Sequence, residues 1–402
     1  MSKTYKNLFE KVITIENLID AYKNASKQKR FKKAILRFDK NLAENFLNLQ
    51  KELSNKNYKH GTYKFFTLYD PKERKISAAP FRDRIVHHAV CQIIEPIFDK
   101  KFIYDSYACR DIKGSHRAVK RLQKSLIGLN RQTDRQTIPL YALKGDISKC
   151  FPSVNHRILT KLLEKKIKDK NTIWLLKEII DSYESGDEYN ELFPANSYFR
   201  IKRPRGIPIG NLTSQIFVNI YLNELDQYLK HQLKVKYYIR YVDDFVILSH
   251  NKKYLHWLTE KIRIFLYSEL YLTLHPKKIR VFPTYLGIDF LGYVIFKDHI
   301  RLRARNVKAF RKRLKRFQKL YLAGKLDEQK IRESITSWLA HSEHADTYNL
   351  RKAIFGKPLT AKDKKEIKEF IQSWSVEVKP QPFPQQTSDR RDHKPFGQFR
   401  LF

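Results

Sequence analysis

Residues 237–248 read YYIRYVDDFVIL, in which two adjacent carboxylates, Asp243 and Asp244, separate two apolar runs. The runs over 237–242 and 245–249 are rich in aromatic and β-branched residues, which predicts two buried strands joined by a turn. Paired carboxylates beside a desolvated core are costly unless a cation offsets their charge. A polar turn whose acids simply face water is the alternative. The apolar approach on both sides favours a cation site.

A third acid ends another apolar run. Residues 139–148 read PLYALKGDIS, which predicts a buried strand with Asp146 near its end. Alone, such an acid is as well explained as a cap of the next helix. Together with Asp243 it predicts a two-metal site, because such sites draw carboxylates from separate strands.

A glycine-rich stretch precedes a long predicted helix over 213–231. Residues 205–215 read RGIPIGNLTSQ. Glycines let a backbone approach a ligand closely, and a helix N-terminus suits a phosphate or a base pair. The stretch has neither the GxxxxGK[ST] nor the GxGxxG pattern, so the loops of ordinary nucleotide hydrolases and dinucleotide-binding proteins are excluded.

Apolar periodicity and turn residues predict the other elements. We expect helices over 1–60, strands over 63–68 and 74–77 with a turn at 70–73, a helix over 84–98 that Pro96 should kink or end, a helix over 156–183, a helix over 252–269, a strand over 279–283 and a hairpin-like region to 302.

Composition narrows the class of partner. The 402 residues include 80 Lys and Arg against 42 Asp and Glu, a net charge of +38, and 42% are hydrophobic, enough for a folded core. Such a charge indicates nucleic acid, and an anionic membrane surface is the weaker alternative. Cys91, Cys109 and Cys150 form no CxxC pair, which favours a reducing, cytoplasmic location over a disulfide scaffold. No apolar run reaches the roughly 18 residues of a membrane span.

The order of these motifs resembles the palm of reverse transcriptases, over about residues 60–355. The strand with Asp146 is followed by the glycine-rich loop and helix, the YVDD hairpin, PKK at 276–278 and FLGY at 290–293. The resemblance implies an α+β, right-hand polymerase fold with fingers, an antiparallel palm sheet that carries the YVDD hairpin, and a helical thumb. The expected parts are a helical N-terminal extension over 1–60, fingers over 61–138, a palm with finger insertions over 139–300, a helical thumb over 301–377 and a mobile basic tail rich in Pro and Gln over 378–402.

The resemblance also implies an activity, an RNA-directed DNA polymerase that extends a DNA or RNA primer on an RNA template with dNTPs. It implies catalytic roles for Asp146, Asp243 and Asp244, and two Mg²⁺ ions, replaceable by Mn²⁺, held by these acids and the carbonyl of Ile147. The nucleotide-binding residues are expected to be Arg82, Arg84, Phe151, Ile209, Gly210 and Lys278. The primer grip is expected to be Phe290, Leu291, Gly292 and Tyr293.

A basic run follows the last predicted strand. Residues 301–320 hold ten Lys or Arg and no acid, with aromatic residues between them. This pattern favours contact with the template–primer backbone through Arg311, Lys312, Lys315 and Arg316 over a merely solvated helix face.

Details resemble the reverse transcriptases of diversity-generating retroelements. The similar segments are IPIGNLTSQ at 207–215, AAPFRDRIVHH at 78–88, DSYACR at 105–110 and SWLAH at 337–341. Most other reverse transcriptases have Gln where this chain has Ile209, so the resemblance implies error-prone copying and a small basic accessory protein as partner. A phage-defence reverse transcriptase and a non-catalytic RNA-binding scaffold are the alternatives, and the intact trio of acids argues against the scaffold.

Overall fold

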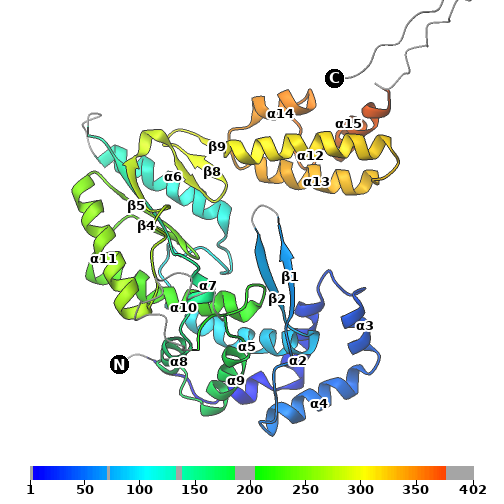
Figure 1. The fold of residues 1–402 in the computed structure, drawn as a ribbon, viewed down its shortest axis with the longest axis vertical. Helices are drawn as coiled ribbons and strands as arrows, with labels where there is room; N and C mark the ends of the chain where they lie inside the picture. The colour runs from blue at the N-terminus through cyan, green and yellow to red at the C-terminus, as the bar shows by residue number, and fades with distance from the viewer. Residues whose placement is uncertain (1–2, 70–72, 133–137, 186–203, 377–402) are drawn as a thin grey trace, which may run out of the picture. The chain divides into compact units, whose positions relative to one another are not determined.

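Figure 1 shows the chain as a computed structural model that describes residues 3–69, 73–132, 138–185 and 204–376. The chain divides into two compact units, Met1–Ile300 and Arg301–Phe402. The expected tail over 378–402 and most of the expected turn at 70–73 lie outside the described residues. The second unit begins at the residue where the sequence predicts a thumb to begin.

The N-terminal helices confirm the prediction for residues before the first strand. They are α1 (Phe9–Val12), α2 (Ile15–Ser26), α3 (Lys33–Asp39) and α4 (Leu42–Ser54). Helices α1, α2 and α3 pack against the long helix α5 (Phe81–Asp99). This helix continues past Pro96, so the proline does not end it. In the last turn a proline removes a single intrahelical hydrogen bond, which the helix tolerates.

The expected single helix over 156–183 is wrong. The chain forms two helices there, α8 (His156–Glu164) and α9 (Lys170–Asp181). Asp169 begins the second helix by accepting hydrogen bonds from the backbone N–H groups of Asn171 and Thr172. The same carboxylate accepts two more at 2.7 Å, from Leu8 and Phe9. Asp169, at the break between α8 and α9, therefore anchors the N-terminal segment.

A four-stranded antiparallel sheet carries the acids. Its order is β4-β5-β3-β6, and its strands are β3 (Tyr141–Asp146), β4 (Tyr238–Tyr241), β5 (Asp244–Ser249) and β6 (Arg280–Pro283). Helix α11 (Lys252–Leu270) packs against β3, β5 and β6, and α6 (Ser115–Gln132) packs against β4. Helix α10 (Leu212–Gln227), continued by the π-helical turn η4 (Tyr228–Gln232), joins the same core. The predicted strands and helices of this region are confirmed, with shorter strand ends.

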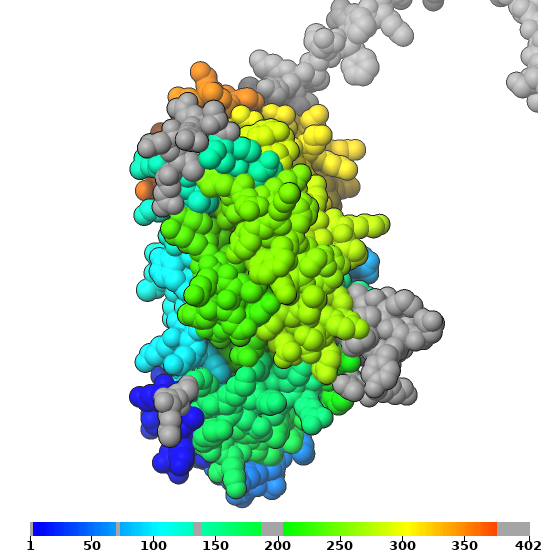
Figure 2. Space-filling view, turned by 90° about the vertical axis from the view of Figure 1, so that its left-hand side faces the viewer, coloured from blue at the N-terminus to red at the C-terminus, as the bar shows by residue number. Residues whose placement is uncertain are grey.

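The remaining elements of the first unit are short. They are β1 (Lys64–Leu68), β2 (Arg74–Ala78), α7 (Cys150–Ser153), η5 (Thr284–Leu286), β7 (Ile288–Phe290) and β8 (Tyr293–Ile295), with β9 (Ile300–Leu302) at the unit boundary. Strands β1 and β2 form a separate two-stranded antiparallel sheet. Helix α11, at the left of Figure 1, faces the viewer in Figure 2 and exposes Trp257, Ile264 and Tyr267.

The second unit is helical over its described residues. It contains α12 (Ala304–Leu322), α13 (Glu328–Ser342), α14 (Tyr348–Phe355) and α15 (Lys364–Val376). The rings of Phe310 and Trp338 stack with centroids 4.0 Å apart and join α12 to α13. Within the described part of the chain, no helix is both long and apolar enough to cross a membrane.

The close pairing of β3 and β5 depends on Gly145. A Cβ there would lie 2.3 Å from the Cζ atom of Phe245, which is wholly buried. We expect Gly145→Ala to lower the free energy of unfolding by about 1–3 kcal/mol, the usual cost of overpacking. Urea unfolding followed by tryptophan fluorescence would measure it.

Gly128→Ala is the control, because a Cβ at this α6 position meets no atom within 4 Å. It should leave stability unchanged or raise it by up to about 1 kcal/mol. Equal behaviour of the two variants would contradict the packing of Phe245 on Gly145.

Candidate active site

Strand register brings the three predicted acids together. Asp146, the last residue of β3, pairs with Asp244, the first residue of β5. Tyr241 also pairs with Asp244, so Val242 and Asp243 form the two-residue turn between β4 and β5. The backbone N–H of Ile147 donates to the carbonyl of Asp243 at 3.1 Å. One edge of the sheet therefore holds all three carboxylates.

The turn itself has an unusual backbone. Val242 has a φ of 54°, in the left-handed region that β-branched residues rarely adopt. Such strain persists only where surrounding contacts hold it, and it is found often at functional sites.

Burial and mutual repulsion perturb the acids. Burial raises the pKa of Asp243, and the charge of Asp146 raises it further, while Lys278 and Arg74 oppose the shift. Burial also raises the pKa of Asp244 to about 7, against the opposing charge of Lys144. The Lys144 Nζ lies 3.8 Å from the Asp244 Oδ2. Lys278, Arg74 and Lys144 therefore oppose the effect of burial, but both pKa values remain raised.

The donor set fits a divalent cation. The Oδ1 atom of Asp244 is buried and accepts no hydrogen bond. Within the described residues, no group of three or more His, Cys, Asp and Glu side chains is arranged to hold one metal ion. Magnesium is commonly held by one or two carboxylates, with water and substrate phosphates completing its shell. Asp146, Asp243 and Asp244 suit that kind of partial site.

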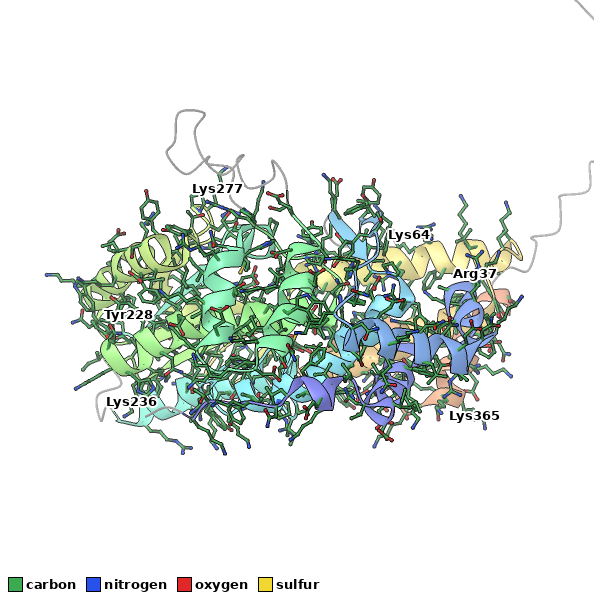
Figure 3. The ribbon with its side chains drawn as sticks, turned by 90° about the horizontal axis from the view of Figure 1, so that it is seen from below. Arg37, Lys64, Tyr228, Lys236, Lys277 and Lys365 are labelled. Atoms are coloured by element: carbon green, nitrogen blue, oxygen red, sulfur yellow. The ribbon has the colours of Figure 1, made fainter. Side chains whose placement is uncertain are left out.

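Lys278 pairs with one of the three acids. Its Nζ lies 2.7 Å from the Asp146 Oδ1, whereas the neighbouring Lys277 is exposed at the outer surface (Figure 3). The predicted contact of Lys278 with a triphosphate stays a prediction. The ion pair shows that its ammonium reaches the acidic edge.

The predicted nucleotide-binding loop lies against β2. The carbonyl of Ile209 accepts a hydrogen bond from the Ser77 N–H at 3.0 Å. Gly210 has a φ of 122°, and a Cβ there would lie 3.1 Å from the Cγ2 of Ile76. The carbonyl of the half-buried Phe151 accepts from the Ile207 N–H at 3.0 Å. The loop that contains Ile207 and Ile209 is therefore linked by backbone hydrogen bonds both to β2 and to Phe151.

Arg82 and Arg84 contact residues of the N-terminal region and of α5. Arg82 pairs with Glu52 of α4, and its guanidinium carbon lies 5.1 Å from the ring centre of Tyr58. The Arg84 guanidinium lies 5.4 Å from the ring centre of Phe81. Their contact with a nucleotide stays a prediction.

The predicted primer grip is a tight hairpin. Phe290 pairs with Tyr293 across β7 and β8, and both side chains are buried. Leu291 and Gly292 form the turn with φ angles of 51° and 92°. Two positive φ angles are typical of two-residue hairpin loops, which explains the glycine.

The predicted thumb contacts lie on one exposed face of α12. Arg311, Lys312, Lys315 and Arg316 are all exposed. Phe310 and Leu314 of the same helix are buried. The amphipathic arrangement agrees with both a nucleic-acid contact and a solvated face.

Sequence reasoning missed two cations at the acidic edge. Lys144 lies two residues before Asp146 on the same strand, so the strand period of two would have identified it. Arg74 acts on the charge of Asp243 from β2. Only the fold brings β2 near that edge, so the sequence held no comparable signal.

Comparisons with known proteins identify the family of this chain. Residues 56–295 match the family model described as reverse transcriptase (RNA-dependent DNA polymerase). Protein YkfC of Escherichia coli is 32% identical over 166 residues, which is 40% of each chain. The group II intron-encoded protein LtrA of Lactococcus lactis is 28% identical over 167 residues, 41% of this chain and 24% of LtrA. The match thus spans less than half the length of these relatives.

Solved telomerase structures are among those with a distant similarity. Apo telomerase from Candida tropicalis, truncated from its C-terminal domain, has a TM-score of 0.45 at 15% identity. The match covers 63% of this chain and 59% of that one.

The raised pKa of Asp244 predicts a pH-dependent stability. Its folded-state pKa of about 7 lies above the unfolded value near 3.9, so ionisation destabilises the folded protein as pH rises through that window. In EDTA, Asp244→Asn should therefore gain stability over wild type between about pH 4 and pH 7, reaching at most about 4 kcal/mol at pH 8. Thermal unfolding at several pH values would measure this.

Asp298→Asn is the control, because this exposed acid has a pKa lowered by hydrogen bonds with its own backbone and His299. It should gain nothing at any pH. A gain for Asp244→Asn that is independent of pH would contradict the electrostatic explanation.

Proposed function

The chain belongs to the reverse transcriptase (RNA-dependent DNA polymerase) family, and from this premise we propose that it makes cDNA by two-metal nucleotidyl transfer. The substrates would be an RNA template, a DNA or RNA primer and dNTPs. The observation that supports this most is the meeting of Asp146, Asp243 and Asp244 at one sheet edge, where burial raises the pKa values of Asp243 and Asp244.

Reverse transcriptases generally use divalent metal ions. Asp146, Asp243 and the carbonyl of Ile147 would hold two Mg²⁺ ions, with Mn²⁺ as a substitute and Asp244 beside them. When bound, such ions lower the pKa of a 3′-hydroxyl and stabilise the charge on the triphosphate and leaving pyrophosphate. The ammonium of Lys278 would leave Asp146 and pair with a phosphate of the dNTP. Arg74 would approach the same phosphates from β2. Phe151 would exclude a 2′-hydroxyl by its bulk.

We expect Asp146→Asn and Asp243→Asn to abolish primer extension on poly(rA)/oligo(dT) while RNA binding survives. The carboxylates would act in the transition state, whereas affinity would come from dispersed Lys and Arg residues. Extension assays and filter binding would measure the two properties. Asp298→Asn, at an exposed position, is the matched control and should extend normally.

Normal cDNA synthesis by a folded Asp146→Asn or Asp243→Asn protein would refute the catalytic assignment. Absence of extension by the wild type, with RNA binding intact, would favour the non-catalytic scaffold.

The basic face of α12 supports a thumb that binds template–primer. Changing Arg311, Lys312, Lys315 and Arg316 to Ala should weaken binding equally across sequences. The slope of log K against log salt should become shallower by up to about one unit for each phosphate that the variant no longer neutralises. Fluorescence anisotropy at several salt concentrations would measure the slope.

A charge-matched control removes four exposed lysines at and before α15: Lys362, Lys364, Lys365 and Lys368. This control should change the slope much less. Equal slopes for the two quadruple variants would show that the basic face of α12 is a solvated face without phosphate contacts.

The biological role is a finer proposal. Motif residues in the loop at 207–215 support a diversity-generating retroelement with a small basic accessory protein. The intron-encoded relatives do not favour it, and phage defence is the alternative role. The three free cysteines support a cytoplasmic location. A template repeat and a variable repeat in the flanking DNA would favour the retroelement.

Ile209 supports error-prone copying, because its side chain has no donor or acceptor to contact a nascent base pair. A hydrogen-bonded contact there would be worth about 1–3 kcal/mol of discrimination, and about 1.4 kcal/mol is tenfold in rate. Ile209→Gln should therefore lower misincorporation by roughly tenfold at some template bases. Sequencing cDNA copied from one RNA by both proteins would measure this.

Ile209→Leu is the control, since it keeps an apolar side chain of the same size, and its errors should match the wild type. Low and indistinguishable error rates in all three proteins would contradict the proposal that the enzyme copies with low fidelity.

A further inference from the structure

A wholly buried arginine precedes the catalytic turn. Arg240 lies in β4, one residue before Tyr241, and both it and its ion-pair partner Asp226 of α10 are 0% exposed. The Arg240 Nε and Nη2 atoms lie 2.7 and 2.6 Å from the two carboxylate oxygens of Asp226. This bidentate geometry fixes the plane of the guanidinium.

The other guanidinium N–H groups point to three further partners. Nη1 donates to the carbonyl of Val242 at 3.0 Å and to the Oδ1 of Asn219 at 3.3 Å. Nη2 also donates to the Oγ of Ser106 at 3.2 Å. Arginine has five N–H donors, and all five are used here.

The partners come from separate parts of the fold. Asp226 and Asn219 belong to α10, and Ser106 belongs to a segment whose backbone pairs with Arg240 on both sides. The Arg240 N–H donates to the carbonyl of Asp105, and the Tyr107 N–H donates to the carbonyl of Arg240, each at 3.0 Å. The guanidinium therefore connects the turn between β4 and β5, by hydrogen bonds, to helix α10 and to the segment around Ser106.

The bond to Val242 reaches the acids. Val242 is the left-handed residue of the turn, and its carbonyl carbon forms the peptide bond with Asp243. A donor that fixes this carbonyl fixes the orientation of that peptide, and with it the direction of the Asp243 side chain toward Asp146. We infer that Arg240 is a positioning residue that holds the strained turn through the Val242 carbonyl, so that Asp243 faces Asp146. The inference rests on the proposed function of these acids.

A purely structural role makes a different prediction. A buried ion pair is weak evidence for stability, because apolar replacements of similar volume are often neutral or stabilising. If Arg240 only neutralises Asp226, an apolar replacement of the network should keep activity. If Arg240 positions the turn, the same replacement should fold and lose activity.

The first test is Arg240→Lys, which keeps the charge but loses the planar fork. We expect kcat for primer extension to fall by about 10- to 100-fold, because small misplacements of catalytic groups cost about that much. KM for dNTP and template–primer affinity should change little. Mn²⁺ titration of the free protein by electron paramagnetic resonance should show several-fold weaker binding.

The matched control is Arg351→Lys, at a half-buried arginine of the second unit whose Nη1 donates to the carbonyls of Pro358 and Leu359. It should match wild type in kcat and Mn²⁺ affinity. Equal kcat and Mn²⁺ binding in folded Arg240→Lys and wild type would overturn the inference.

A second variant covers the case in which Arg240→Lys fails to fold. Combining Arg240→Met, Asp226→Leu and Tyr238→Phe removes the ion pair together with the hydroxyl that donates to Asp226 at 2.7 Å. A folded triple variant with wild-type kcat and Mn²⁺ binding would overturn the inference, and one that loses both would support it. If the wild type extends no primer, the proposed function fails, while the Mn²⁺ titrations still decide the role of Arg240.

Discussion

Antiparallel pairing of β3 with β5 sets Asp146 opposite Asp244 and forces three carboxylates to share one partly buried sheet edge. Burial raises the pKa values of Asp243 and Asp244, and the neighbouring negative charges raise them further. Such an edge suits the divalent cations of the proposed function. Lys278 and Lys144 supply part of the compensation, and the buried, unbonded Oδ1 of Asp244 leaves a position for more.

The neighbouring residues keep this arrangement rigid. Gly145 lets the ring of Phe245 close over β3, so the register cannot shift without exposing the core. The left-handed Val242 compresses the turn to two residues, and the buried Arg240 holds its carbonyl. Strain and a buried charge are each unfavourable alone. Here both lie within three residues of Asp243 in sequence, where orientation would matter for the proposed nucleotidyl transfer.

Much of the fold and of the acidic site could be predicted from sequence, because the sequence patterns that indicate them are local. Apolar runs next to acids predicted β3, β4 and β5, and their motif order identified the family. Contacts between distant segments could not be predicted. Asp169 splits one expected helix because its carboxylate meets Leu8 and Phe9. Arg240 of β4 forms an ion pair with Asp226 of α10, which lies fourteen positions away in sequence. Arg82 pairs with Glu52, which no motif indicated.

The most direct test of the account is anomalous diffraction from Mn²⁺ in crystals of the protein with an RNA–DNA template–primer and a non-hydrolysable dNTP. The account predicts two peaks about 3.5–4 Å apart, both in contact with Asp146 and Asp243. Peaks elsewhere, or density for a primer end remote from these carboxylates, would contradict it.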